Sequence, residues 1–338
     1  AKFIRTRRPE AVTQTGDALT NRAYALALQY GGNDNYEGFR RLDSEWDFIS
    51  AALPRLLTGD NDRLQMVCSQ LAQFLDFTGR WDEAIWFNEQ AEERAFAADD
   101  KENAGWQAYR AGVIYHRRKQ PTEVLACATR AAEHWKNSTP HQKAFAIQLG
   151  GGGHSLNKDF PAAIIAFREG LEIDRSISPE SEDVATDLSD LAGAEYANKD
   201  YPAAERDYRE ALRIDKKNKQ QEGIASDLGN LAGLALDREQ WAEAESLARE
   251  ALALAEKVGR QELIANDCHH LAKALLKQFQ VGATRPAQAS ALSDREGSPL
   301  QEALSLSRRA VEIYTRLRHP SLQSTQETLG EIEKAIHE

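Results

Sequence analysis

The sequence predicts an all-α protein, a right-handed α-solenoid of antiparallel helix pairs with a repeat of about 40 residues. An aromatic residue followed by small residues at helical spacing begins at Tyr201, and this pattern returns 40 residues later at Trp241. The same register extends back to Phe160, Pro121 and Trp81, at steps of 39 to 41 residues. No stretch shows the alternation of β-branched and polar residues that is typical of strands, so we expect no sheet.

Composition excludes several classes of protein. The 338 residues carry a formal net charge of −11, with a pI of about 5.4 and a mean hydropathy of −0.60, which argues against a general nucleic-acid partner. No apolar run approaches the roughly 18 residues of a membrane span, and no hydrophobic segment follows Arg8 as in a signal peptide. Three cysteines far apart suit a reducing, cytoplasmic compartment. The chain begins at Ala1 rather than Met, so we interpret it as a piece of a longer protein.

Residues 1–61 are expected to lie outside the repeat register. We predict a flexible lead-in over residues 1–15 and then a helix from Gly16 to Tyr30, ended by two glycines. A second helical stretch follows, with these apolar residues on one face: Leu42, Trp46, Phe48, Ile49 and Leu53.

Six helix pairs are predicted over residues 62–318. Their expected helices are Leu64–Phe77 and Trp81–Ala97, Trp106–His116 and Glu123–Trp135, one pair around Gly150–Gly153 and Phe160, one pair on either side of Asn198–Tyr201, one pair within Ile224–Val258, and Leu263–Lys277 with a helix from Leu300. The last pair is interrupted by an inserted loop at residues 279–298, rich in Gly, Ala, Ser and Pro, which we expect to be mobile. Residues 319–338 supply a final helix that caps the apolar end of the stack.

The small and aromatic residues of this register resemble those of the tetratricopeptide repeat (TPR). Ala192, Tyr201, Ala204, Tyr208 and Ala211 follow the order of that motif. Small residues let two antiparallel helices approach closely, and the aromatic fills the wedge between neighbouring hairpins. The resemblance implies that the chain binds a peptide or protein. The repeat is longer than the usual motif of about 34 residues, as in TPR arrays of large signalling proteins.

Two further motifs resemble a junction in bacterial signalling NTPases of the STAND class (the NB-ARC type). They are the Leu-Asp-x-Glu-Trp core at residues 42–46 and the Gly-Arg-Trp-Asp-Glu-Ala run at residues 79–84. In that class the nucleotide-binding region passes into a C-terminal TPR sensor at such a junction. The resemblance implies a bacterial ligand-sensing or autoinhibitory arm, with an ATPase domain of the same longer chain as a partner. The alternative is a self-contained regulator or scaffold, like the peptide-controlled TPR regulators of bacteria or the kinesin light chains.

The TPR resemblance also implies a ligand groove on the inner face of the first helix of each pair. Carried onto this chain, the groove residues are Trp106, Tyr109, Phe145, Gln148, Ser189, Asn230, Asn266, His269 and Lys273. We expect an extended peptide or a protein surface, with an apolar anchor near the three aromatics. Chaperone-binding TPRs grip a C-terminal carboxylate with a Lys/Asn/Lys/Arg arrangement, which these positions lack, so that ligand is not expected. In the alternative interpretation the aromatics pack against the N-terminal helices, and His269 and Lys273 are ordinary surface residues.

No stretch predicts an enzyme, a metal site or a cofactor site. The glycines Gly150–Gly153 precede His154 rather than the Gly-Lys-Ser/Thr of a phosphate loop, so we interpret them as a close helix contact and a candidate hinge. In Cys268-His269-His270, adjacent helical side chains point about 100° apart and cannot converge on one ion.

A last pattern is a set of aspartates spaced by 40 residues, Asp187, Asp227 and Asp267. Arg168, Arg209 and Arg249 recur 18 or 19 residues before them. We predict an ion-pair ladder between successive hairpins, with a charged recognition stripe as the alternative.

Overall fold

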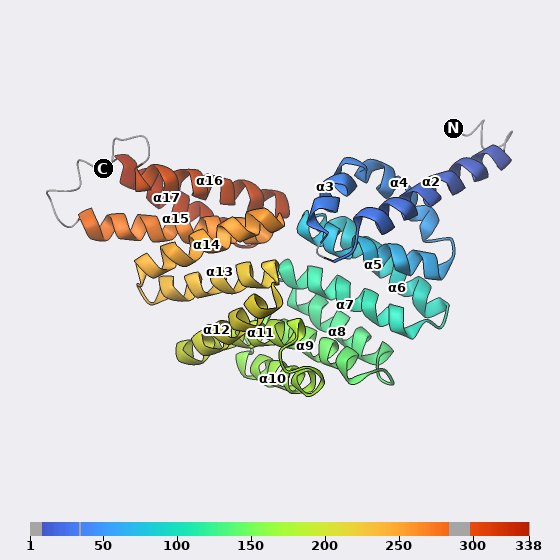
Figure 1. Ribbon diagram of the computed structural model, residues 1–338, viewed down its shortest axis with the longest axis horizontal. Helices are drawn as coiled ribbons and strands as arrows, with labels where there is room; N and C mark the ends of the chain where they lie inside the picture. Colours follow the sequence, from blue (N-terminus) through green and yellow to red (C-terminus); the bar gives the residue numbers. More distant parts are fainter. Residues whose placement is uncertain (1–8, 34, 284–297, 338) are drawn as a thin grey trace. The chain divides into compact units, whose positions relative to one another are not determined.

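The computed structural model describes residues 9–33, 35–283 and 298–337, and over these residues it contains sixteen helices and no strand (Figure 1). The all-α prediction is therefore confirmed. The helices are α2 (Pro9–Tyr30), α3 (Tyr36–Ser44), α4 (Trp46–Leu56), α5 (Asn61–Phe77), α6 (Trp81–Ala97), α7 (Lys101–Arg117), α8 (Pro121–His134), α9 (Pro140–Leu156), α10 (Phe160–Ile177), α11 (Glu182–Ala197), α12 (Tyr201–Asn218), α13 (Gln221–Asp237), α14 (Trp241–Val258), α15 (Gln261–Ala283), α16 (Pro299–Leu317) and α17 (Leu322–His337). Within the described ranges, none of them combines the length and apolar character needed to cross a bilayer.

The chain forms two compact units. The first consists of Ala1–Ile114 and Ala126–Thr139, and the second of Tyr115–Leu125 and Pro140–Glu338. Two of the three boundaries fall inside helices, so α7 and α8 each contribute residues to both units.

In the first unit, the N-terminal helices α2, α3 and α4 pack on one another and on α5. The flexible lead-in expected over residues 1–15 is wrong for residues 9–15, because α2 already begins at Pro9; residues 1–8 lie outside the described part of the chain. The expected second helical stretch is two helices rather than one. It breaks at Glu45, yet Leu42, Trp46 and Leu53 are all buried as expected.

The turns inside the helix pairs repeat with the sequence period. Gly79, Lys119, Lys158, Lys199 and Glu239 each have a positive φ, between 56° and 72°, and each stands two residues before a second helix. At Lys199 this left-handed conformation lets the backbone N–H of Asp200 donate to the carbonyl oxygen of Glu195 (2.9 Å), which satisfies an orphan carbonyl of α11. The same turn geometry therefore sets how each pair folds back.

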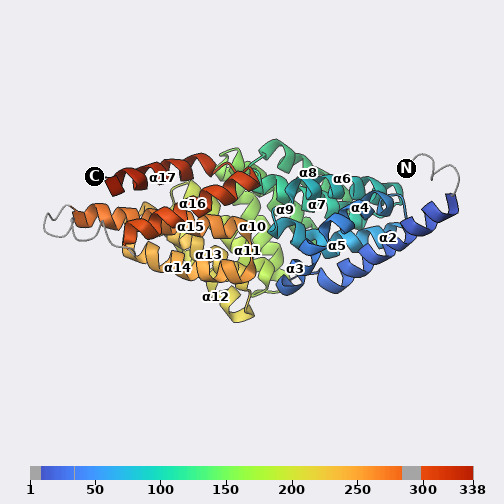
Figure 2. The ribbon, with the colours of Figure 1, turned by 90° about the horizontal axis from the view of Figure 1, so that it is seen from above.

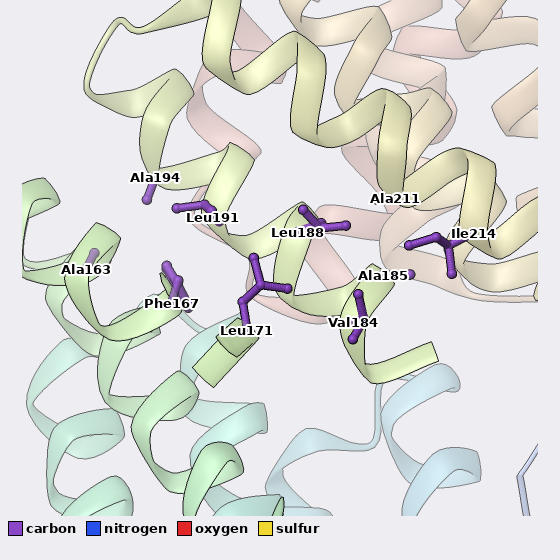
Figure 3. Packing of buried hydrophobic residues seen from close by; sticks show 10 residues of the cluster. All are labelled: Ala163, Phe167, Leu171, Val184, Ala185, Leu188, Leu191, Ala194, Ala211 and Ile214. Carbon is purple, nitrogen blue, oxygen red and sulfur yellow. The ribbon is translucent and has the colours of Figure 1, made fainter. Parts of the chain in front are cut away.

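In the second unit, successive helix pairs stack in chain order (Figures 1 and 2). The first helices of neighbouring pairs contact each other, α11 with α13 and α13 with α15. Figure 3 shows one core cluster, in which Phe167 and Leu171 of α10 meet Leu188 and Leu191 of α11. A second cluster confirms the aromatic wedge: Tyr208 packs with residues of the following pair, Leu231 and Leu234.

The tetraglycine stretch lies inside α9, and its packing interpretation is confirmed. A Cβ on Gly151 would stand 2.9 Å from the ring of Phe167, and one on Gly153 would stand 2.7 Å from Leu125. These distances are too short for any larger residue, so glycine lets α9 approach its neighbours closely.

The final pair differs from the prediction in one boundary. Helix α15 continues to Ala283, five residues into the range expected to be a loop, and the part of that loop at residues 284–297 lies outside the described residues. Helices α16 and α17 follow, and Leu276, Leu300 and Ile332 close the core at this end.

Candidate ligand-binding face

Three successive first helices of the second unit turn the same positions toward solvent. We call this surface the first-helix face; it consists of Thr186, Ser189, Asp190 and Gly193 on α11, Ser226, Asn230 and Gly233 on α13, and Asn266, His269 and Lys273 on α15. All of these residues are half-buried or exposed, whereas Leu271, Ala272 and Leu275 on the core side of α15 are buried. The 40-residue period places equivalent positions on neighbouring helices, so the face continues from one repeat to the next.

Four polar residues of this face have no partner within the described part of the chain. The side chains of Asn230, Asn266, His269 and Lys273 form no hydrogen bond or ion pair with any described residue. The Nδ1 atom of His269 is buried and also unpartnered. Buried polar atoms are normally paired in a folded protein, so the buried Nδ1 atom of His269 is an exception. Because no described residue occupies these donors and acceptors, they remain available to a ligand.

Polar residues on the second helices behave differently. Arg249 on α14 binds Glu245 one turn earlier at 3.0 Å and Glu302 of α16 at 2.9 Å. Arg209 on α12 likewise binds Glu205 at 2.9 Å and Glu243 at 3.4 Å. These arginines are thus paired within the protein, unlike the four polar residues of the first-helix face.

The charge of the face on α15 comes from Lys273. Burial, together with the positive charge of Lys273, lowers the pKa of His269 from 6.5 to about 4. The pKa of His270 is lowered to about 3, again by burial first and then by His269 and Lys273. Both imidazoles are thus neutral at pH 7, and the ammonium group is the cation of this part of the face.

The predicted ion-pair ladder is wrong. Asp187, Asp227 and Asp267 are at most 1% exposed, and the arginines expected to meet them bind glutamates instead, as Arg209 and Arg249 do above and as Arg168 does with Glu195 at 3.0 Å. The aspartates lie between neighbouring helices and not on their outer surface. Burial rules out the recognition stripe as well, because a ligand cannot reach these carboxyl groups.

The buried aspartates are held in the protonated form. Burial raises the pKa of Asp187 to about 9 and that of Asp227 to about 8, and it raises the pKa of Asp267 well above the usual value. The hydroxyl of Ser189 donates to Asp227, whereas the equivalent position on α13 is Gly229. Asp267 therefore has no hydrogen-bond partner on either oxygen among the described residues.

The expected aromatic anchor is divided between the two units. Trp106 and Tyr109 belong to the first unit, where their rings pack at 5.0 Å and 6.3 Å from that of Trp135. Phe145 belongs to the second unit and packs against His141, with ring centroids 4.6 Å apart. The two ring contacts with Trp135 hold Trp106 and Tyr109 against the residue that follows α8.

Gln148 is part of the interior. It is 8% exposed, and its Nε2 donates to a carboxylate oxygen of Asp174 at 2.9 Å. The other oxygen of Asp174 lies 2.9 Å from His141 Nδ1. This buried network joins α9 to α10, so Gln148 contributes to the scaffold beneath the face.

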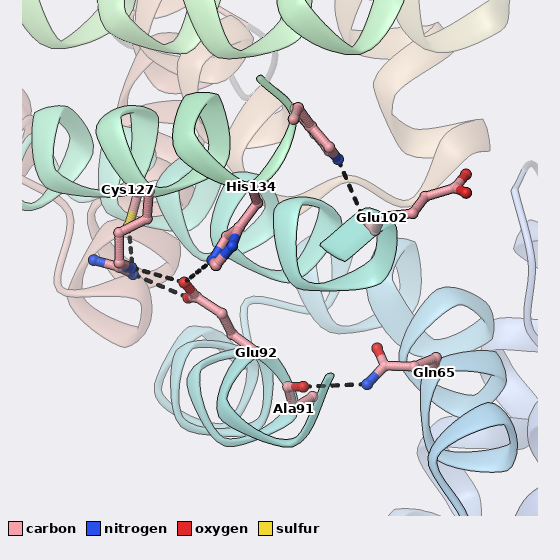
Figure 4. Close-up of polar contacts among 8 residues, drawn as sticks. Gln65, Ala91, Glu92, Glu102, Cys127 and His134 are labelled. Carbon is pink, nitrogen blue, oxygen red and sulfur yellow. Dashed lines mark hydrogen bonds and ion pairs between the residues drawn. The ribbon is translucent and has the colours of Figure 1, made fainter. Parts of the chain in front are cut away.

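A second polar cluster, in the first unit, is fully paired (Figure 4). Glu92 accepts two hydrogen bonds from Arg130, at 2.9 and 3.2 Å, and lies 3.1 Å from His134 Nε2. The neighbouring Cys127 is buried, and burial raises its pKa to about 11, so it stays a thiol at neutral pH. The geometry indicates a structural carboxylate held by Arg130 and His134, beside a thiol that is not a nucleophile.

One feature of the face could not be found from the sequence. Arg117 lies 3.0 Å from Glu262, at the start of α15, although the two residues are 145 positions apart. Burial alone would raise the pKa of Glu262, but Arg117 and His319 outweigh it and hold the pKa at about 2. No local pattern signals a contact over this separation. By contrast, the 40-residue register indicates the positions of Asp190 and Gly193 on the face, because they are equivalent to residues of the later repeats.

Comparisons with known proteins agree with this architecture. A tetratricopeptide repeat family model matches residues 184–216 and 226–258, which cover α11 to α14. No curated protein sequence matches the chain. Among solved structures, a Rap protein complexed with competence and sporulation factor is 13% identical, with 96% of this chain and 99% of that chain covered and a TM-score of 0.58. Aspartyl phosphate phosphatase F from Bacillus subtilis is 12% identical, with 95% and 93% covered and a TM-score of 0.51. The second unit therefore contains tetratricopeptide repeats, and the chain has the all-helical fold of TPR-like proteins.

Proposed function

We propose that the chain is a peptide- or protein-binding module whose first-helix face holds an extended segment of the partner. The observation that carries this proposal is the set of polar side chains without partners, Asn230, Asn266, His269 and Lys273. An asparagine amide offers both donors and an acceptor, and an extended backbone presents N–H and C=O groups in alternation. Two asparagines on neighbouring helices therefore suit the main chain of a bound peptide.

Two further points support a binding role. A structural neighbour that covers nearly the whole chain was solved with a separate factor bound, competence and sporulation factor. The polar cluster around Glu92 is internally satisfied, and the thiol beside it is protonated. We therefore propose binding rather than catalysis as the activity of this chain.

The test is a binding measurement on the two asparagines. The probe is a random hexapeptide library, and retention is compared between the wild type and the double variant Asn230→Ala, Asn266→Ala. We expect the double variant to lose about tenfold or more in retained peptide, because two amide–backbone contacts of about 1 kcal/mol each are removed. The matched control is Asn157→Ala, an exposed asparagine in the turn after α9. Equal retention by all three proteins would refute the assignment of the face.

The biological setting that we propose is the sensor arm of a STAND-type NTPase, in line with the two motifs of the first unit. These motifs touch: the guanidinium of Arg80 lies 2.7 Å from Asp43 and 5.0 Å from the ring centroid of Trp46. The residues that carry the resemblance thus form one contact, which supports their origin as a single structural junction.

The gene itself distinguishes this setting from the alternative. An in-frame region encoding a nucleotide-binding P-loop upstream of Ala1 would support the sensor arm. A start codon immediately before Ala1 would instead favour a stand-alone regulator or scaffold with the same binding face.

A further inference from the structure

We propose that Lys273 binds a carboxylate group of the ligand, so that the first-helix face selects acidic peptides. The inference rests on the binding role proposed above and narrows its ligand class. It is carried by the position of one half-buried cation without an ion pair, beside two neutral histidines and above aspartates that are buried and protonated.

Lys273 has no counter-ion among the described residues. No carboxylate of the described residues lies within ion-pair distance of the Lys273 ammonium, although the protein carries 53 acidic residues against 42 basic ones. Most other cations of the second unit are paired; Lys277, one turn further along α15, lies 3.8 Å from Glu331. Other lysines of the second unit without an ion pair, such as Lys119 and Lys199, are exposed to water, whereas Lys273 is half-buried.

The histidines and buried aspartates around Lys273 carry no charge at neutral pH. His269 and His270 flank Lys273 on α15, and burial keeps both rings neutral at pH 7. Asp227 lies between α11 and α13, where Ser189 donates to it, and Asp267 lies between α13 and α15 beside Gly229; burial keeps both in the protonated form. The positive charge of Lys273 is therefore not cancelled by these neighbours, and it is half-buried, where screening by water is weaker than at an open surface.

The Lys273 ammonium group has room around it for a ligand, and further polar side chains lie nearby. The positions equivalent to Lys273 on the two preceding repeats are Gly193 and Gly233, so no long side chain from α11 or α13 competes for the ammonium group. Asn266 lies two turns before Lys273, with His269 between them, on the same side of α15. An amide N–H₂, an imidazole and an ammonium group in this order suit an anionic group with several acceptor oxygens.

The absence of a four-residue carboxylate clamp does not conflict with this inference. That arrangement surrounds a chain end with several cations, whereas a single ammonium group needs one carboxylate. The carboxylate comes from an Asp or Glu side chain or from the C-terminus of the peptide, and the experiment separates these sources.

The experiment uses four pools of random hexapeptides: with or without one fixed glutamate, and with a free or an amidated C-terminus. Each pool is offered to the wild type and to Lys273→Met, Lys273→Arg and Lys277→Met. Methionine removes the charge and keeps much of the apolar stem, and a melting curve of each variant establishes that it is folded.

We expect the wild type to retain at least one carboxylate-bearing pool about tenfold better than the neutral, amidated pool, because a charge-assisted hydrogen bond is worth about 1.5–3 kcal/mol. Lys273→Met should abolish this preference, Lys273→Arg should keep most of it, and Lys277→Met should leave it unchanged. The preference should also weaken as salt is added. Preference for the glutamate pool identifies a side-chain carboxylate, and preference for the free C-terminus identifies the chain end.

The experiment distinguishes failure of the Lys273 proposal from failure of the proposed binding role. Equal retention of all pools by the wild type and by Lys273→Met would overturn the role of Lys273 and leave the binding role intact. No retention of any pool by the wild type would overturn both.

Discussion

Asp227→Asn is expected to flatten the pH dependence of stability between about pH 7 and about pH 8. Asp227 is 1% exposed, and burial raises its pKa from 3.8 to about 8, with the Ser189 hydroxyl partly offsetting that rise. A carboxyl group whose pKa is raised on folding contributes full stability below its unfolded pKa. That contribution is lost as the pH rises through the folded pKa.

The magnitude follows from proton linkage. At pH 7 the unfolded chain has released this proton and the folded chain still holds it, so the free energy of unfolding falls with a limiting slope of about 1.4 kcal/mol per pH unit. Since Asp227 in the folded protein begins to release its proton toward pH 8, the slope becomes smaller there. We therefore expect this residue to lower the free energy of unfolding by about 1 kcal/mol between about pH 7 and about pH 8. Asp187 and Asp267 contribute in the same direction.

The chosen interval separates these aspartates from the histidines and from Glu262, although Asp215, whose pKa burial raises to about 7, contributes in the same direction. Burial lowers the pKa of His116, His269 and His270 from 6.5 to about 4, 4 and 3, so their opposite effect on stability falls mainly below pH 6.5. The pKa of Glu262 is lowered from 4.5 to about 2, and its contribution changes only in acid.

The assay is urea unfolding followed by far-ultraviolet circular dichroism at about pH 7 and about pH 8. Asparagine resembles the protonated acid in shape and still offers an oxygen to Ser189. Between about pH 7 and about pH 8, the free energy of unfolding of the variant should fall by about 1 kcal/mol less than that of the wild type. The control is Asp62→Asn, at an exposed position of α5, which should keep the wild-type slope. An unchanged slope in Asp227→Asn would show that the buried carboxyl is already ionised, and the reasoning would be refuted.

Three further predictions concern the scaffold. Gly105→Ala should lower stability by about 1–3 kcal/mol, because the new Cβ would stand 2.2 Å from Nε1 of Trp135; an unchanged melting temperature would contradict this contact. Glu92→Gln should cost about 2 kcal/mol, since it leaves Arg130 without its ionised partner in a partly buried site, and chemical denaturation would reveal the loss. Arg249→Ala should change the free energy of unfolding by less than about 1 kcal/mol, because its pairs are solvent-exposed; a larger loss would mean that they act as a network.

Local sequence determined the helical architecture of this protein. The period that links Trp81 to Trp241 decides which side of each helix is apolar, and a helix with one apolar side packs on it whatever its distant partners are. Local sequence also predicted some helix boundaries: α6 spans Trp81–Ala97 as expected, and Gly259, with a φ of 85°, ends α14. The face itself was predictable, because position within a repeat indicates which residues are left on the open side.

Tertiary structure alone decided how the polar groups pair. The sequence shows that Asp227 and Arg209 recur in step, but periodicity cannot tell a carboxylate between two first helices from one beside a second helix. The contact of Arg117 with Glu262 spans 145 residues and depends on the accumulated rotation of every intervening pair. Burial of Gln148 and the lack of a partner at Lys273 are likewise results of packing, since hydrogen bonding depends on distances of a few tenths of an ångström that no spacing of residues specifies.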